Sequence, residues 1–147
     1  MTFPRPIDEV FDFFRRPANL LRVNPPDLHM SLQEAPEVLQ QGSRVVIQVR
    51  RFGIPQRLES EITALEPNVL LVDELRQGPF RKWVQTHRFA KTPEGTCVTF
   101  QIDFEPPGGM LGLVVNAASI EKELQAVFAY RAAKLHELLG PNPNGNV

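Results

Sequence analysis

The feature that most constrains the fold is a series of segments between residues 28 and 104 in which apolar and polar residues alternate. In the last segment, Val98, Phe100, Ile102 and Phe104 alternate with Thr99, Gln101 and Asp103. Successive side chains of a strand point to opposite faces, so each segment has one apolar face and one polar face. This pattern is typical of an antiparallel sheet that is covered on one side only.

The alternation predicts about six strands, separated by turns rich in Gly and Pro. They cover residues 28–33, 44–50, 57–62, 70–76, 83–89 and 97–104, with turns at 52–55, 78–79 and 93–95. Helices are predicted on both sides of this series. Two short ones occupy residues 6–14 and 18–23, where Pro6 suits a first helical turn and Asn24-Pro25-Pro26 stops the second helix.

A long helix is predicted from about Leu111 or Asn116 to Leu139, ended by Gly140 and Pro141. Its apolar residues recur at steps of three and four and form a stripe interrupted only at Arg131. The stripe consists of Ile120, Leu124, Val127, Phe128, Leu135 and Leu138. A one-sided sheet needs a cover, and this helix has the matching face. We therefore expect an α+β domain over residues 1–140, followed by a disordered tail over 141–147.

Several short sequences occur in an order that resembles the START/Bet v 1-like superfamily, also called SRPBCC or polyketide cyclase/dehydrase-like. They include Val10-Phe11-Asp12-Phe13-Phe14, Asn24-Pro25, Val72-Asp73-Glu74, Gly78-Pro79-Phe80 with Trp83, His87-Arg88-Phe89, and Phe128-Ala129-Tyr130-Arg131. The likeness is greatest to the bacterial ligand-binding branch. It implies a helix-grip fold, in which a curved sheet wraps around the long helix and leaves a hydrophobic cavity. Members bind lipids, sterols, quinones or polyketides, and some catalyse cyclisation or dehydration.

The chain departs from this pattern in two places. Only Met1-Thr2-Phe3 precedes Pro4, so either the usual first strand is truncated or absent, or the chain starts upstream of this sequence. The strand at 97–104 would then be an exposed edge, which predicts a homodimer or a covered edge. The second departure is Gln85, which stands where this branch often carries a histidine. An amide keeps hydrogen bonding but cannot transfer protons, which weakens any scheme with paired histidines.

Candidate ligand-binding residues lie mainly on the strand that follows the Gly78-Pro79 turn. Its inward face carries Trp83, Gln85, His87 and Phe89, since the opposite face is charged. Buried polar groups need partners, so an imidazole and an amide on an apolar face suggest a ligand pocket. Further wall residues are Phe100, Ile102, Phe104, Leu124 and Phe128. Each aromatic residue here has two interpretations, as core and as wall.

Three polar residues remain open to alternative interpretations. His87 could orient a ligand or act as an acid or base, but we favour a buried imidazole bonded to a neighbouring strand. Asp73 is the nearest candidate carboxylate, and its facing depends on a hairpin register that the sequence leaves undetermined. Arg131 could bind a ligand carboxylate, although snorkelling or an internal pair with a sheet carboxylate is the interpretation we favour.

The composition narrows the kinds of partner and cellular compartment that we expect for this protein. The net charge of −1 gives no attraction to nucleic acid or to an anionic membrane, and no stable membrane insertion is expected. A single cysteine, Cys97, and the absence of a signal peptide favour the cytoplasm. No residues have metal-ligand spacing, and no cofactor is expected.

Three functions remain in consideration. The first is binding of a small hydrophobic ligand, for transport or sensing. The second is a cyclase or dehydratase in which His87 would be the catalytic residue; enzymatic activity is left undecided, with binding preferred. The third is a protein-interaction role that uses the open strand edge.

Overall fold

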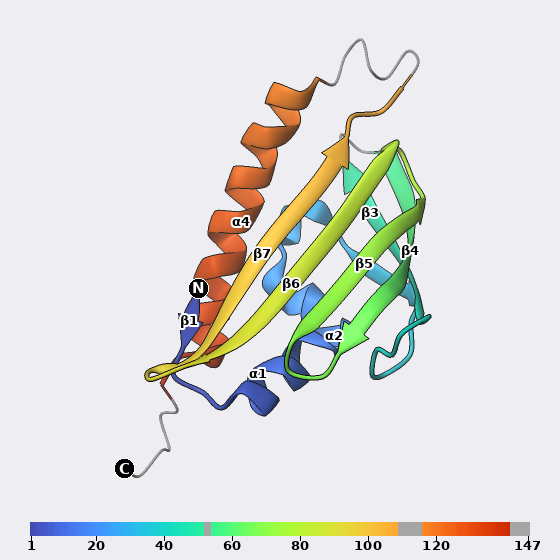
Figure 1. Cartoon of the computed structure of the whole chain (residues 1–147). Coiled ribbons are helices and arrows are strands. Elements are labelled where there is room, and N and C mark those ends of the chain that lie inside the picture. Colours follow the sequence, from blue (N-terminus) through green and yellow to red (C-terminus); the bar gives the residue numbers. More distant parts are fainter. Residues whose placement is uncertain (52–53, 109–115, 142–147) are drawn as a thin grey trace.

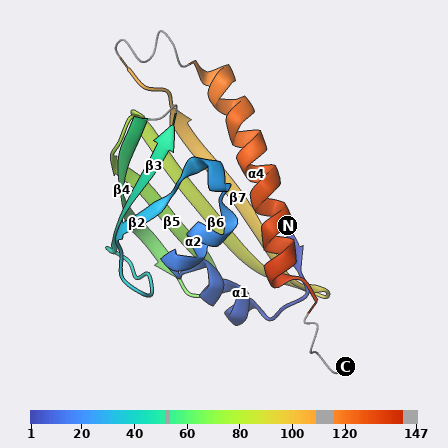
Figure 2. The same cartoon turned by 180° about the vertical axis from the view of Figure 1, so that it is seen from behind.

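A computed structural model describes residues 1–51, 54–108 and 116–141, with the side chains of residues 51 and 54 left out. The predicted helix start at Leu111 and nearly all of the predicted tail lie outside the described residues. Figure 1 shows one curved sheet with helices behind it, and Figure 2 shows the same arrangement from the helical side. The two views together place α1, α2 and α4 on one face of the sheet.

The sheet has seven antiparallel strands in the order β1-β7-β6-β5-β4-β3-β2. Their bounds are β1 Thr2–Phe3, β2 Ser31–Glu34, β3 Arg44–Arg51, β4 Ile54–Glu66, β5 Leu70–Gln77, β6 Lys82–Thr92 and β7 Gly95–Glu105. The prediction of a helix-grip α+β fold is confirmed. There are seven strands rather than about six because the first strand is present in truncated form, with two residues.

The helices are α1 (Ile7–Phe14), α2 (Pro17–Val23), the single-turn η1 (Pro26–Leu28) and α4 (Ala117–Leu139). Asn116 caps α4, since its side chain accepts a hydrogen bond from the Ser119 backbone N–H at 2.9 Å. Three details differ from the sequence prediction. Residues 54 and 55, predicted as part of a turn, begin β4 and pair with the end of β3. Residues 28–30 are not part of a strand, because the prolines before them form η1 and His29 adopts φ 46°. Pro17 begins α2 instead of merely closing α1.

The hydrophobic core occupies the end of the molecule where β1 meets the last turns of α4. Phe3, Val10 and Leu135 are fully buried there, and Leu139 packs with them at 4% exposure. Burying one such side chain contributes about 1.5–3 kcal/mol. This end of α4 is therefore the part of the helix that anchors it to the sheet.

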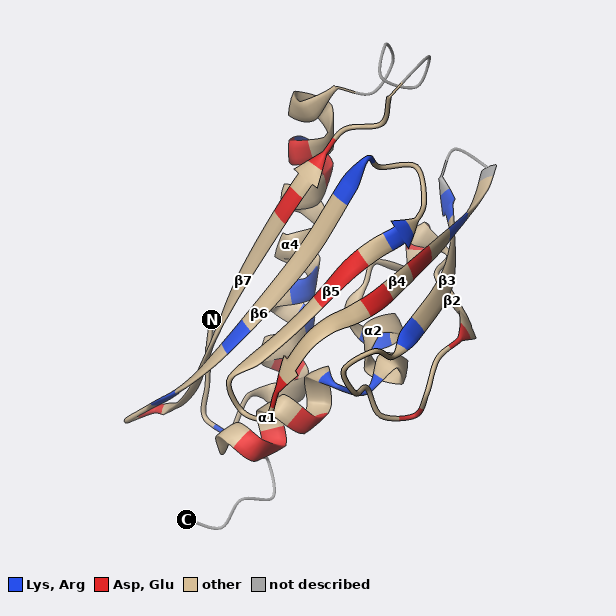
Figure 3. Ribbon diagram, turned by 45° about the vertical axis from the view of Figure 1, so that its right-hand side comes forward, with Lys and Arg blue, Asp and Glu red and all other residues tan. Residues whose placement is uncertain are grey.

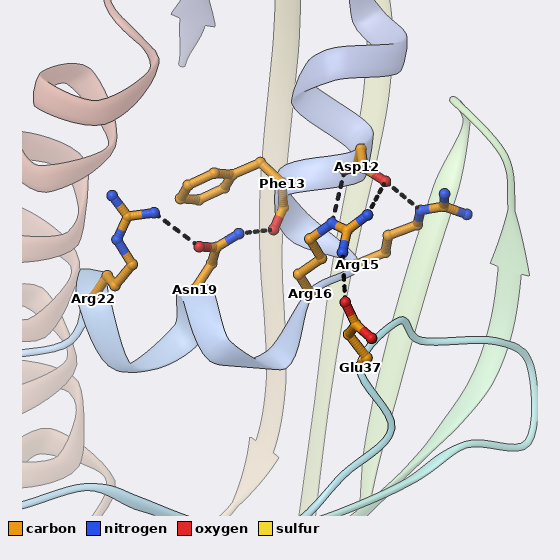
Figure 4. A network of polar contacts seen from close by, with 7 residues as sticks. All are labelled: Asp12, Phe13, Arg15, Arg16, Asn19, Arg22 and Glu37. Atoms are coloured by element: carbon orange, nitrogen blue, oxygen red, sulfur yellow. Dashed lines mark hydrogen bonds and ion pairs between the residues drawn. The ribbon is translucent and has the colours of Figure 1, made fainter.

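A polar network holds the corner between α1 and α2 (Figure 4). Asp12 accepts hydrogen bonds from Arg15 Nε at 2.9 Å and Arg16 Nε at 2.8 Å, and these two arginines lower the pKa of its carboxyl, Arg16 more than Arg15. Asn19 Nδ2 donates to the Phe13 carbonyl at 2.9 Å. These contacts hold the end of α1 to the beginning of α2.

Charged residues lie on the outer face of the sheet. Figure 3 shows acidic and basic positions interspersed along β4 to β7. Arg76, for example, pairs with Glu61 at 3.0 Å and Glu74 at 3.4 Å across this face. Exposed pairs of this kind contribute little stability, but they identify the solvated side of the sheet.

β1 covers only the beginning of β7. Thr2 pairs with Cys97 and Phe3 with Thr96, and the Met1 backbone exchanges hydrogen bonds with Val98. The close approach needs a glycine at position 95, which has φ 140° and where a Cβ would lie 2.1 Å from the Phe3 carbonyl oxygen. Beyond Val98, this edge of β7 pairs with no strand among the described residues.

Candidate functional site

A cavity of about 270 Å³ lies between the sheet and the helices. Its floor consists of apolar residues of the concave sheet face, and α1, α2 and α4 form its cover. The floor residues include Val45, Ile47, Val49, Leu58, Ile62, Leu71 and Leu75. This volume is just below the usual range of small-molecule sites, about 300–1,000 Å³, and the wall is predominantly apolar, as is usual for such sites.

α4 has different surroundings along its length. Leu135 and Leu139 are buried in the core, whereas Leu124, Val127 and Phe128 line the cavity and stay half-buried. The apolar stripe predicted from the sequence is therefore one continuous helix face. Its C-terminal part packs in the core, and its N-terminal part lines the cavity. The cavity exists because this half of the helix lies over the sheet without large side chains filling the space between them.

A chain of polar side chains crosses the cavity wall from the sheet to α4. Gln85 connects the sheet to the helix, because its Nε2 donates to Asp73 Oδ1 at 3.5 Å and its Oε1 accepts from Arg131 Nη1 at 3.4 Å. Arg131 Nη2 donates to Asn24 Oδ1 at 2.8 Å, and Asn24 Nδ2 donates to the Leu20 carbonyl at 2.7 Å. The chain therefore joins β5, β6, α4 and the end of α2.

Asp73 faces the cavity because the hairpin register pairs it with Gln85 on β6 and with Ile62 on β4. Burial in this apolar wall raises the pKa of its carboxyl to about 7, and the nearby positive charge of Arg131 only partly opposes that rise. A carboxyl with this pKa can be protonated or ionised near neutral pH.

His87 lies on the same wall and is 8% exposed. Burial and, to a smaller extent, the Arg131 charge lower the pKa of its imidazole to about 3, although a backbone hydrogen bond with Leu71 opposes both. Its ring packs at 4.9 Å from Phe100 and 5.5 Å from Phe14, and its Nδ1 has no hydrogen-bond partner. The imidazole is therefore neutral and offers one free polar atom.

Most of the residues predicted for ligand binding line the cavity. They are Asp73, Trp83, Gln85, His87, Ile102, Leu124, Phe128 and Arg131. Three others are not among the lining residues: Phe89 packs on Phe11 and Phe14, Phe100 on Phe14 and His87, and Phe104 on Phe80 and Trp83. These three rings form the layer that supports the wall.

Several cavity residues come from helices that the sequence interpretation did not assign to the site. Asn24 is the most important, since it is 5% exposed and is the closest hydrogen-bond partner of Arg131. Phe13, Leu20 and Val23 line the cavity beside it. The helical spacing of apolar residues on α1 predicts a buried face, but no local signal indicates which buried face borders a cavity.

A second depression, of about 440 Å³, opens on the surface between α1 and the turn that joins β4 to β5. Asp8, Glu9, Asp12, Arg15, Phe11, Pro67 and Asn68 line it. Its wall is mostly charged and open to solvent, so it lacks the enclosure of a small-molecule site. We therefore place the candidate site in the inner cavity.

Within the described residues, no three His, Cys, Asp or Glu side chains are grouped as a metal site would require. The helices among these residues are also too short or too polar to cross a bilayer.

Comparison with known proteins gives a match over almost the whole chain. Residues 1–140 match the sequence profile of the family described as polyketide cyclase / dehydrase and lipid transport. No match was found among curated proteins.

Solved structures with the same fold come from distant organisms. A Chromobacterium violaceum protein is similar with a TM-score of 0.72 at 14% identity, covering 97% of this chain and 94% of its own. Ginseng major latex-like protein 151 from Panax ginseng has a TM-score of 0.67 at 18% identity, with 96% and 94% covered. The AHSA1-like protein from Aeromonas hydrophila has a TM-score of 0.66 at 16% identity, with 98% and 94% covered. Identities this low show a shared fold.

Proposed function

Because the chain belongs to the polyketide cyclase/dehydrase and lipid-transport family, we propose that it binds a small hydrophobic molecule in the cavity between the sheet and α4. A lipid, quinone or polyketide-like compound would suit a wall of this composition, and the protein would transport or sense it. The observation that supports this most directly is a predominantly apolar cavity with a few polar groups on one side of its wall.

The polar groups would orient the ligand. Gln85 and Asn24 both accept hydrogen bonds from Arg131. The three side chains therefore present a preorganised polar end within an otherwise apolar space. A ligand bound here would bury its apolar part against β3 to β5 and would direct its polar end toward α4. Burial of the apolar part would supply roughly 25 cal/mol per Å² removed from water.

The chain provides its own reporter for this proposal. Trp83 is the single tryptophan and lines the cavity. We expect titration with fatty acids, fatty alcohols and quinones to change its fluorescence saturably, and native mass spectrometry to identify a retained ligand.

A matched pair of variants on α4 distinguishes ligand binding in the cavity from binding at the protein surface. Val127→Phe places a ring in the cavity, whereas Gln125→Phe places the same ring on the exposed face of the helix. Val127→Phe should weaken binding at least tenfold, and Gln125→Phe should leave it unchanged. If both variants bind like the parent protein, or if no hydrophobic compound binds at all, the proposal fails.

A second candidate function, a cyclase or dehydratase, is favoured by one observation. Asp73 can hold or release a proton near neutral pH, and the unpartnered Nδ1 of His87 lies on the same wall. In this scheme Asp73 would be the acid or base, because a pKa of about 3 makes the His87 imidazole a weak base. The test is turnover of a polyketide-like substrate that Asp73→Asn abolishes while binding persists.

A further inference from the structure

Arg131 is a buried cation whose hydrogen-bond partners are both neutral. Within the described part of the chain its guanidinium forms no ion pair; Nη1 donates to Gln85 and Nη2 to Asn24, both of which are amides. Its Nε is buried without any partner. A buried charge left without a hydrogen-bonded counter-charge costs free energy, so this arrangement is suited to an anion supplied from outside the chain.

The remaining charged and titratable groups on the cavity wall come from four elements. Arg16, between α1 and α2, is already paired with Asp12 and Glu37. His87 on β6 is neutral. Glu123 is on α4, eight residues before Arg131, which is about 12 Å along a helix. Asp73 on β5 is the carboxyl whose charge acts on Arg131, and it is bonded to Gln85, which lies between them.

We infer that the ligand carries one anionic head group, a carboxylate, and that Arg131 binds it through Nε and an adjacent Nη nitrogen. This inference rests on the proposed binding function and specifies its ligand class as amphipathic carboxylates. The geometry supports it, because a guanidinium presents neighbouring N–H groups that match the two oxygens of a carboxylate. The hydrogen bonds to Asn24 and Gln85 hold the guanidinium plane in place.

Phe128 makes a cation–π contact with Arg131. The guanidinium carbon lies 5.4 Å from the ring centroid, and both residues line the cavity. This contact adds to the two hydrogen bonds in holding the guanidinium at the wall, and in our proposal the ligand approaches along the edge that carries Nε. An edge approach is the one that allows a bidentate contact.

Asp73 makes this binding depend on pH. A bound carboxylate raises the pKa of Asp73 further, because two like charges in one cavity disfavour each other. The complex therefore favours the protonated form of Asp73. As the pH rises above about 7, ionised Asp73 competes for Arg131, and the affinity for a carboxylate should fall by up to about tenfold per pH unit.

The experiment compares a long-chain fatty acid with its alcohol and its methyl ester, using Trp83 fluorescence at pH 6.5 and pH 8.5. We expect the acid to bind at least tenfold more tightly than the other two at pH 6.5, as a charge-assisted contact requires. Equal affinities would overturn the carboxylate inference and leave hydrophobic binding intact. Absence of binding by all three would overturn both.

Variants test the residue assignment. Arg131→Met replaces the charged side chain with an apolar one of similar length. It should abolish the preference for the acid while the alcohol still binds. Lys122→Met, on the exposed side of the same helix, is the control and should behave like the parent protein. A retained preference in Arg131→Met would refute the assignment.

Asp73→Asn supplies a second readout if Arg131→Met does not fold. Its affinity for the acid should exceed that of the parent protein at pH 8.5 and match it at pH 6.5. The alcohol should show no pH dependence in either protein. A parent-like fall in acid affinity between the two pH values in this variant would contradict the role of Asp73.

Discussion

At the scale of single residues, the cavity brings together two titratable groups whose pKa values are shifted toward their neutral forms. Burial raises the pKa of Asp73 from 3.8 to about 7 and lowers that of His87 from 6.5 to about 3. Folded Asp73 therefore holds a proton more tightly than it does in the unfolded chain, and folded His87 holds one less tightly. Their contributions to stability have opposite dependence on pH.

The sign of each contribution follows from this linkage. The stability due to protonated Asp73 is fully present below pH 3.8 and is lost as the pH rises toward 7. The stability due to neutral His87 is present above pH 6.5 and is lost as the pH falls toward 3. Between about pH 4 and 6.5, Asp73 makes the free energy of unfolding fall with rising pH and His87 makes it rise. Each slope is at most about 1.4 kcal/mol per pH unit.

Single substitutions should reveal the contribution of each residue to the pH dependence of stability. Relative to the parent protein, Asp73→Asn should gain stability as the pH rises from 4 to 7, and His87→Gln should lose it over the same interval. Urea unfolding at several pH values and constant ionic strength measures the differences. Parallel stability curves for parent and variants would show that neither group is shifted as described.

At the scale of elements, α4 is one helix with two environments. Leu135 is fully buried in the core beside β1, whereas Leu124 lines the cavity and is half-buried. The two residues are the same type on the same face, so their truncation compares the two environments directly.

We expect Leu135→Ala to lower the free energy of unfolding by about 2–5 kcal/mol, because it leaves a void in a packed core. Leu124→Ala should cost clearly less, since its side chain already borders empty space. Chemical denaturation of both variants without ligand measures this. Equal losses would mean that the cavity half of α4 is packed as tightly as the core half.

At the scale of the whole molecule, β1 pairs only with the beginning of β7, and within the described residues no strand pairs with the rest of that edge. Val98 uses its backbone N–H and C=O to bond Met1, so the alternating pattern of a strand directs those of Phe100, Ile102 and Phe104 to the same open side. Unpaired groups of this kind form a template for another strand. We propose that two copies pair antiparallel along this edge.

Sedimentation equilibrium across micromolar to submillimolar concentrations tests the dimer. Gln101→Lys places like charges close together across a two-fold axis near the middle of this edge, so it should shift the equilibrium toward monomer. Thr86→Lys, on the outer face of the interior strand β6, is the control and should leave the equilibrium unchanged. A parent protein that is monomeric at every concentration would contradict the proposal.

Much of this architecture could be predicted because its signals are local. Alternation along β6 placed Trp83, Gln85 and His87 on one face, and the structure places all three on the cavity wall. The spacing of apolar residues on α4 likewise predicted the face on which Arg131 lies. Both inferences depend only on the periods of a strand and a helix, which a single segment specifies.

The sequence by itself determined the fold class, the order of elements and the residues of each inward face. Only the tertiary structure decided that Asp73 faces the cavity and that Arg131 contacts Asn24, 107 residues earlier in the chain. It also decided which of the aromatic residues predicted for the wall lie behind the cavity surface. The physical reason is that periodicity reports on neighbours along the chain. Register and long-range partners depend on how all the elements pack together.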